Sequence, residues 1–272
     1  MLKRLAILIL TALLLAGCNS APPEASPPTT LPVKPETTII PEEPEASSAP
    51  AQPEPTAAPS EETMPPPPTL HSGIREDGSF DKGTLFIGDS QTYLLIEDYL
   101  KPNGLIGDAK YTAQCGSQLT AFWDSNIRPT EDRSVYCTFS PEFQGMTFCE
   151  AAAQLGMEAT AIYLMWGSNY TPDATAQSYI DIVECLLDIC PYATVHLQTI
   201  PQGQVAYVTV NERITGAWAY FQSIGETRVT LVDTFSGIGT SIGSDMVHVT
   251  PLGREKWYET LLLHAQTLGL EQ

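Results

Sequence analysis

A serine and a histidine in this chain have the residue types that nucleophilic acyl transfer requires. Ser90 ends the tripeptide Gly88-Asp89-Ser90, which directly follows the apolar run Leu85-Phe86-Ile87, and Asp245 precedes His248 by three residues. A serine hydroxyl is a poor nucleophile until a base takes its proton, and histidine has a pKa suited to that work near neutral pH. We therefore take Ser90 as the candidate nucleophile and His248 as the candidate base.

The other histidines are less suitable as the base. His71 borders a proline-rich segment, His196 lies inside an expected strand, and His264 lies on the expected terminal helix. His248 lies in an expected loop with an aspartate nearby, just before that helix. A general base needs to reach the hydroxyl from which it takes the proton, and a loop at the end of a sheet allows this.

Two further polar segments follow expected strands. Gln114-Cys115-Gly116 ends the second strand, and Trp166-Gly167-Ser168-Asn169 ends the third. Ligands of open α/β sheets bind at the carboxyl ends of the strands. An oxyanion that develops there needs preorganised donors, each typically contributing about 3 kcal/mol. Gly116 can supply a backbone donor and Asn169 a side-chain donor.

Each segment by itself has an ordinary explanation. A Gly-Asp-Ser tripeptide occurs by chance in roughly one chain in ten of this length. A glycine at a strand end often serves only the backbone. The order of the segments, all at the same end of the expected sheet, is more specific than any one of them.

Together these segments resemble the SGNH (GDSL-type) hydrolase family, serine hydrolases on a flavodoxin-like α/β/α sandwich. The resemblance covers most of residues 80–268 through four motif blocks. It implies that Ser90 is the nucleophile, that His248 is the general base and later the general acid, and that Asp245 orients the imidazole. It also implies an oxyanion hole formed by the N–H groups of Ser90 and Gly116 and by the side-chain amide of Asn169.

The chain departs from the family pattern at two positions. Gln91 stands where the GDSL name has Leu, which we interpret as a local variation at a helix start. Tyr170 follows Asn169 where an acidic residue is often found, which affects contacts on the substrate side. For Asp89 we favour a hydrogen bond within the strand–helix turn over a part in catalysis.

Short apolar stretches alternate with helical patterns over residues 71–272. Continuous apolarity indicates strands covered on both faces, as in parallel sheets. The alternation predicts an α/β fold, a three-layer sandwich with a parallel sheet of about five strands. Ser134–Ser140 could be a sixth strand or a hairpin insertion. The expected strands are Thr84–Ile87, Lys110–Gln114, Ala161–Trp166, Thr194–Ile200 and Val229–Val232, and the last helix is expected to start near Pro251.

The first 18 residues have the pattern of an export signal. Lys3 and Arg4 precede the apolar run Leu5–Ala16, which is shorter than the roughly 20 residues of a transmembrane helix. Leu15–Cys18 resembles a bacterial lipobox, which implies cleavage before Cys18 and a diacylglycerol group on its sulfur. An ordinary signal peptide with a chance cysteine is the alternative. The lipobox predicts a lipid-anchored protein on the extracytoplasmic side of a bacterial cell membrane.

Residues 19–70 differ in composition from the rest of the chain. Sixteen of the 23 prolines lie there, and the segment has no aromatic residue. Such a segment cannot bury enough apolar surface to offset its ordering entropy. We expect a disordered tether that holds the domain at 71–272 away from the membrane.

Charge and cysteine content limit the partners. A net charge of −19 argues against binding to nucleic acid. The five cysteines after Cys18 are an odd number, and no two have the spacing of a zinc or thioredoxin site. We expect mainly small buried thiols, without assigning any pairing. No cofactor and no metal are expected.

The sequence thus favours a serine esterase that removes short acyl groups, such as acetyl, from glycans. Trp123, Trp166 and Tyr170 are candidates for stacking against sugar rings. A lipase, thioesterase or acyltransferase could use the same triad, since one triad serves all acyl transfer. A binding lipoprotein without activity remains a third possibility.

Overall fold

The computed structural model describes residues 69–124, 143, 146–169, 171–201, 203–204 and 206–270. The chain divides into two units, Met1–Glu62 and Thr63–Gln272, and every described residue belongs to the second. The expected signal segment with Cys18, nearly all of the expected tether, the stretch Ser134–Ser140 and Tyr170 lie outside the described residues.

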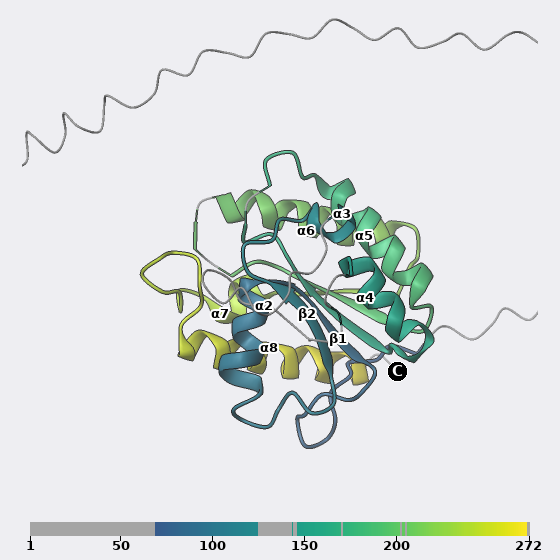
Figure 1. Ribbon diagram of the computed structural model, residues 1–272, viewed down its shortest axis with the longest axis horizontal. Coiled ribbons are helices and arrows are strands. Elements are labelled where there is room, and N and C mark those ends of the chain that lie inside the picture. Colours follow the sequence, from purple (N-terminus) through teal and green to yellow (C-terminus); the bar gives the residue numbers. More distant parts are fainter. Residues whose placement is uncertain are drawn as a thin grey trace, which may run out of the picture. The chain divides into compact units, whose positions relative to one another are not determined.

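A parallel sheet of five strands forms the centre of the domain, in the order β2-β1-β3-β4-β5 (Figure 1). Every residue of β1, β3 and β4 is buried, because helices cover both faces of the sheet. The expected α/β fold, the parallel sheet and all five expected strands are confirmed, with differences of one or two residues at the carboxyl ends. The strands are β1 (Thr84–Asp89), β2 (Lys110–Gln114), β3 (Ala161–Met165), β4 (Thr194–Gln198) and β5 (Val229–Val232).

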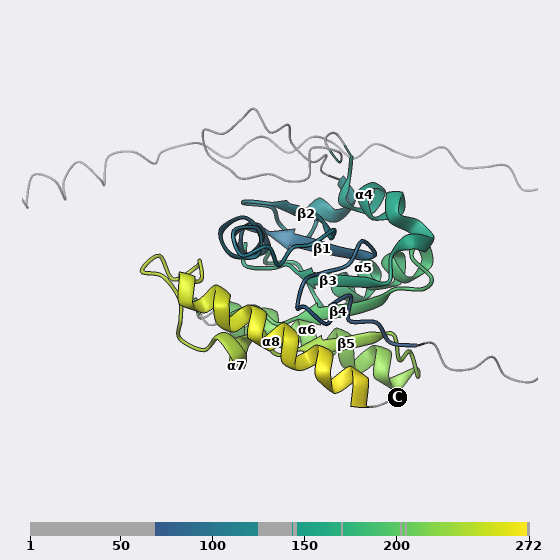
Figure 2. The same cartoon turned by 90° about the horizontal axis from the view of Figure 1, so that it is seen from below.

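The helices form the two outer layers (Figures 1 and 2). On one face, α2 (Ser90–Leu95) continues into a π-helical turn, η1 (Ile96–Leu100), which packs against α8 (Pro251–Leu270). The other face carries α4 (Phe148–Leu155), α5 (Ala176–Ile189) and α6 (Ala206–Ser223), of which α5 contacts both neighbours. The short elements are α3 (Ala121–Asp124), η3 (Gly156–Glu158) and α7 (Thr234–Ile238).

The direction of the strand order reverses beside β1. From β1 the chain crosses to β2 on one side, and the later strands continue on the other side of β1. Ligands bind at such a reversal, outside the carboxyl ends of the strands. The turn after β1 and the loops that follow β2 and β3 therefore border one site.

The described cysteines divide into two kinds. Cys115, at the end of β2, is disulfide-bonded, so the expectation of a buried thiol is wrong there. Cys149, Cys185 and Cys190 are free, and only Cys190 is fully buried. A thiol and a bonded cysteine have the same residue type, so spacing alone could not distinguish them.

Of the helices in the described part of the chain, none combines the length and apolarity needed to cross a bilayer. The same residues contain no group of three or more His, Cys, Asp or Glu side chains arranged to hold a metal ion.

Candidate active site

Ser90 lies where β1 passes directly into α2. Asp89 caps this helix, because its Oδ1 accepts the Gln91 N–H at 3.0 Å while its own backbone is extended. Ser90 is thus the first helical residue, at the carboxyl end of β1, and is 5% exposed. A strand–turn–helix of this kind fixes the backbone on both sides of the hydroxyl.

The expected histidine reaches this hydroxyl. His248 Nε2 lies 3.2 Å from Ser90 Oγ, and His248 Nδ1 lies 2.7 Å from Asp245 Oδ2. The carboxylate, the imidazole and the hydroxyl are thus hydrogen-bonded in series, which is the arrangement of a nucleophile with an oriented base. The structure therefore brings together the three residues that the sequence suggested.

Asp245 is held as a carboxylate by its own loop. Its Oδ1 accepts the N–H groups of Val247 and His248, each at 3.0 Å. The Val247 N–H, followed by the contact with the His248 ring, lowers the pKa of Asp245 to about 2. An ionised carboxylate at Nδ1 keeps the proton on that nitrogen, which leaves Nε2 free to accept one from Ser90.

The strand register places the strands that lead to both expected oxyanion donors next to β1. Asp89 of β1 pairs with Gln114 of β2, two residues before Gly116, and Gly88 pairs with Met165 of β3, four residues before Asn169. Gly116 and Asn169 therefore follow strands on opposite sides of the nucleophile.

The backbone at Gly116 and the amide of Asn169 have properties that suit this use. Gly116 is exposed and has φ +74°, a conformation that favours glycine. The Asn169 Nδ2 is buried and has no hydrogen-bond partner among the described residues. A buried donor without a partner is costly, and binding an oxyanion is one reason for a protein to keep it.

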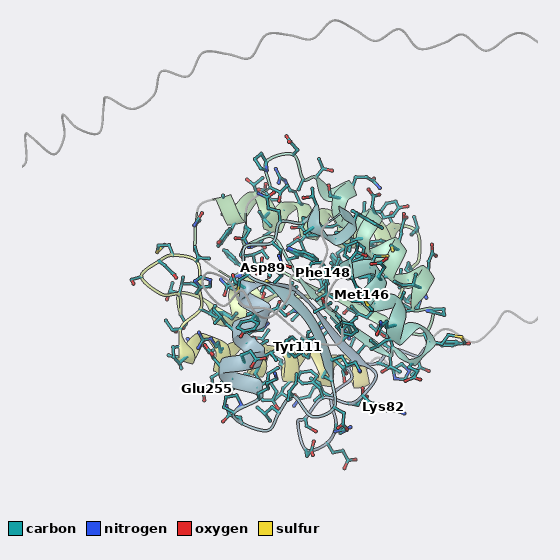
Figure 3. All side chains as sticks on the ribbon, viewed as in Figure 1. Lys82, Asp89, Tyr111, Met146, Phe148 and Glu255 are labelled. Atoms are coloured by element: carbon teal, nitrogen blue, oxygen red, sulfur yellow. The ribbon has the colours of Figure 1, made fainter. Side chains whose placement is uncertain are left out.

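Asp89 joins the turn at Ser90 to the loop after β3. Its Oδ2 accepts the N–H of Gly167 at 3.2 Å, and the N–H and hydroxyl of Ser168 at 2.9 and 2.6 Å. Figure 3 labels Asp89 at the end of β1, beside the start of α2. Burial raises the pKa of Asp89, and these three donors, together with the Gln91 N–H, act against that rise. The structural interpretation of Asp89 is confirmed, although its reach across to β3 was not expected.

The loop that carries Asn169 depends on a glycine. Gly167 has φ +132°, and a Cβ there would lie 2.6 Å from the Tyr179 hydroxyl and 2.9 Å from Val210 Cγ1. Tyr207 also donates to the Ser168 carbonyl at 2.9 Å. The backbone leading to Asn169 is therefore fixed by contacts with α5 and α6.

Trp166 is not a surface for stacking sugars. It is 1% exposed, its ring packs on Phe148 at 4.4 Å between centroids, and its Nε1 donates to the Ser117 carbonyl at 3.2 Å. The indole therefore joins the loop that follows β3 to the loop that contains Gly116. Tyr170, the other stacking candidate in the site, lies outside the described residues.

Trp123 does offer an exposed ring. It is 43% exposed and lines a cavity of about 330 Å³ between the loop that follows Gly116 and the segment that follows Asn169. The described lining mixes polar and apolar side chains: Gln118, Leu119, Thr120, Trp123, Thr171, Pro172, Asp173, Ala174, Ser178, Asp181 and Ile182. A larger cavity, of about 540 Å³, lies beside α6 and α7, but none of the candidate catalytic residues lines it.

The sequence did not reveal the part that Gln91 plays. Its side chain is fully buried and hydrogen-bonds the backbone on both sides of His248. The interpretation as a variation at the helix start is therefore incomplete. An amide directly after the nucleophile was the available signal, but its partner lies more than 150 residues away in the chain.

No family model and no curated protein matches the chain. Solved structures do match it in fold, at low identity. A carbohydrate esterase family 3 protein from Talaromyces cellulolyticus has 15% identity and a TM-score of 0.41 over 68% of this chain and 97% of that one. A GDSL-like lipase from Bacteroides thetaiotaomicron has 11% identity and a TM-score of 0.47 over 73% and 92%.

The catalytic domain of peptidoglycan O-acetyltransferase A from Streptococcus pneumoniae has 16% identity and a TM-score of 0.43, over 69% of this chain and 94% of that one. At these identities the likeness concerns the fold alone, and the chemistry rests on the distances within this chain.

Proposed function

We propose that this protein is a serine esterase that removes short acyl groups from glycans. The observation that carries the proposal is the relay from Asp245 Oδ2 through His248 to Ser90 Oγ, at 2.7 and 3.2 Å. A relay with these residue types is suited to moving a proton from a hydroxyl nucleophile.

The first half of the reaction forms an acyl-enzyme. His248 Nε2 takes the Ser90 proton while Ser90 Oγ bonds to the ester carbonyl carbon, whose oxygen becomes an oxyanion. The N–H groups of Ser90 and Gly116 and the Asn169 Nδ2 donate to that oxygen. When the tetrahedral intermediate collapses, the ester C–O bond breaks and His248 gives its proton to the departing alcohol.

The second half repeats these steps with water. His248 takes a proton from a water molecule, whose oxygen attacks the acyl carbon of the Ser90 ester. Collapse of this second intermediate returns the proton to Ser90 Oγ and releases a carboxylic acid. Asp245 stays ionised throughout, because its pKa of about 2 lies far below neutral pH.

The cavity beside the oxyanion loops supports a glycan as the alcohol part of the substrate. An exposed Trp123 ring with amide, hydroxyl and carboxylate groups around it can stack on a sugar and hydrogen-bond its hydroxyls. Asp173 and Asp181 line the cavity, and the whole chain carries a net charge of −19. Neutral glycans are therefore favoured over polyanionic ones.

The proposal includes a location. Lipid on Cys18 would anchor the protein to a bacterial membrane, and residues 19–70 would let the domain reach extracytoplasmic glycans. The composition of these segments supports this part of the proposal.

The test is an esterase assay on the mature chain. The substrates are p-nitrophenyl esters from acetate to laurate, then acetylated xylan and acetylated peptidoglycan. Each reaction is run with and without an added sugar acceptor. We expect hydrolysis of the shortest esters, and a loss of several powers of ten in Ser90→Ala and in His248→Ala. Activity that survives in folded Ser90→Ala would contradict the mechanism, and transfer to the sugar in place of hydrolysis would make the protein an acyltransferase.

A further inference from the structure

The side chain of Gln91 bridges the backbone on both sides of His248. Its Nε2 donates to the Val247 carbonyl, and its Oε1 accepts the Val249 N–H at 3.2 Å. Gln91 is 0% exposed, so water does not compete for these bonds. One amide thus satisfies a donor and an acceptor that flank the candidate base.

The other end of this bridge is the nucleophile. Gln91 follows Ser90 in the first turn of α2, and its own N–H is fixed by the Asp89 carboxylate at 3.0 Å. The side chain therefore leaves a rigid backbone, one residue from the hydroxyl. It connects the turn that carries Ser90 with the loop that carries His248, which are remote in sequence. The distance between these two segments decides whether proton transfer can occur.

The histidine loop, residues 243–250, also has hydrogen bonds that act within the loop itself. Asp245 accepts the N–H groups of Val247 and His248, and the Gly243 N–H donates to the His248 carbonyl at 2.7 Å. These bonds orient the imidazole relative to Asp245. They do not set its distance from Ser90, because both of their ends move together with the loop.

We propose that Gln91 is a positioning residue, which holds His248 Nε2 within hydrogen-bond distance of Ser90 Oγ. The inference rests on the proposed function, in which that contact transfers the proton. It also gives a physical reason for the amide at a position where the name of the similar family has Leu. An apolar side chain there could form neither bond.

The Gln91 bridge and the contact between His248 and Asp245 have separable effects. Without the bridge, His248 and Asp245 still face each other, so the acidic limb of the kcat/KM profile should stay in place. The rate should fall, because a displacement of about 1 Å between reacting groups costs about 100-fold. Binding of a small ester does not use Gln91, so KM should change little.

The experiment compares Gln91→Met with the parent in the mature full-length chain. Methionine keeps the length of the side chain and removes both hydrogen bonds. Gln198→Met is the matched control, since Gln198 is 1% exposed and accepts the Trp257 Nε1–H at 2.7 Å, on β4. Both variants lose a buried amide contact, but only one contact lies beside the base.

Three measurements are made on each protein: melting temperature, the pH profile of kcat and KM with p-nitrophenyl acetate, and a crystal structure. We expect both variants to melt earlier. Gln91→Met should lose about 10- to 100-fold in kcat with an unmoved acidic limb, and its Ser90–His248 distance should lengthen. Gln198→Met should keep the kcat of the parent.

The outcomes separate the two proposals. An active parent with an unchanged kcat in Gln91→Met, despite earlier melting, overturns the role of Gln91 and leaves the esterase proposal standing. A parent without esterase activity overturns the proposed function. In that case the crystal structures still decide the geometric claim, and an unchanged distance between Ser90 Oγ and His248 Nε2 refutes it.

Discussion

Lowering the pH from 6.5 to 4.5 is expected to reduce the free energy of unfolding by about 3 to 5 kcal/mol. The reason is that one buried and one partly buried histidine take up protons more readily in the unfolded chain. Burial, followed by the neighbouring His264, lowers the pKa of His196 to about 3. Burial lowers the pKa of His264 to about 4. Both are therefore neutral in the folded domain at pH values where an unfolded histidine is charged.

The contacts of His196 explain the shift. Its ring is 0% exposed and stacks on Tyr163 at 4.5 Å between centroids. Its Nδ1 lies 2.8 Å from the Thr230 hydroxyl and 3.3 Å from His264 Nε2, and its Nε2 lies 2.8 Å from the His71 carbonyl. No described acidic side chain is hydrogen-bonded to either ring, so a charge gained there would lack an ion-pair partner.

The sign follows from where the protons bind. Below pH 6.5 the unfolded state binds them and the folded state does not, so stability falls as the pH falls from 6.5 toward the folded-state pKa values. Each histidine contributes about 1.4 kcal/mol per pH unit in this window. Two units and two groups give an upper bound of about 6 kcal/mol, because an unfolded histidine is only half protonated at pH 6.5, and partial exposure of His264 lowers the value further. Asp245 acts in a lower window, because its contribution is lost only below its ordinary pKa of 3.8.

Urea unfolding between pH 4.5 and 7.5 measures the effect. His264→Gln keeps an amide near Thr230 and His196 but removes one titrating group, so the slope of unfolding free energy against pH should fall by about half. A stability that stays flat between pH 7 and 4.5 would refute the reasoning. So would a His264→Gln protein with the slope of the parent.

Three further predictions concern the site and the anchor. Asn169→Ala should lower kcat about 100- to 1,000-fold with p-nitrophenyl acetate, the usual loss for one oxyanion donor, and a loss below about threefold would remove Asn169 from the oxyanion hole. Trp123→Ala should raise KM for acetylated xylan but not for p-nitrophenyl acetate, since only the glycan reaches the cavity; equal changes in both would argue against a sugar subsite. Cys18→Ala should move the protein from the detergent phase to the aqueous phase in phase partitioning, and unchanged partitioning would rule out the lipid anchor.

The strands and the catalytic candidates were predictable because their signals are local. A run such as Ala161–Met165 is apolar at every position, as expected of a strand covered on both faces. His248 was chosen by its place in a loop, and the expected places of His196 and His264 also agree with the structure. The start of α8 at Pro251 follows from the preference of proline for the first helical turn.

Other features depend on contacts with distant residues, which a local sequence pattern does not predict. The helix α4 has eight residues, rich in alanine, with a capping box between Thr147 and Glu150 that is clear only once the helix is known. Trp166 has an aromatic ring that suits a sugar or a core equally well, and its contacts with Phe148 and Ser117 decide for the core. Tertiary contacts, which local spacing does not encode, set these outcomes.

The neighbours of Ser90 explain how a short motif can organise a site spread over the chain. Asp89, on one side, accepts three hydrogen bonds from the Gly167-Ser168 segment that leads to Asn169. Gln91, on the other side, holds the segment that carries His248. The loop that carries Asn169 and the loop that carries His248 are therefore each hydrogen-bonded to a residue adjacent to Ser90. The turn at Ser90 thus positions both loops of the site. A substitution at Asp89 or Gln91 should therefore change kcat, although neither residue performs the chemistry.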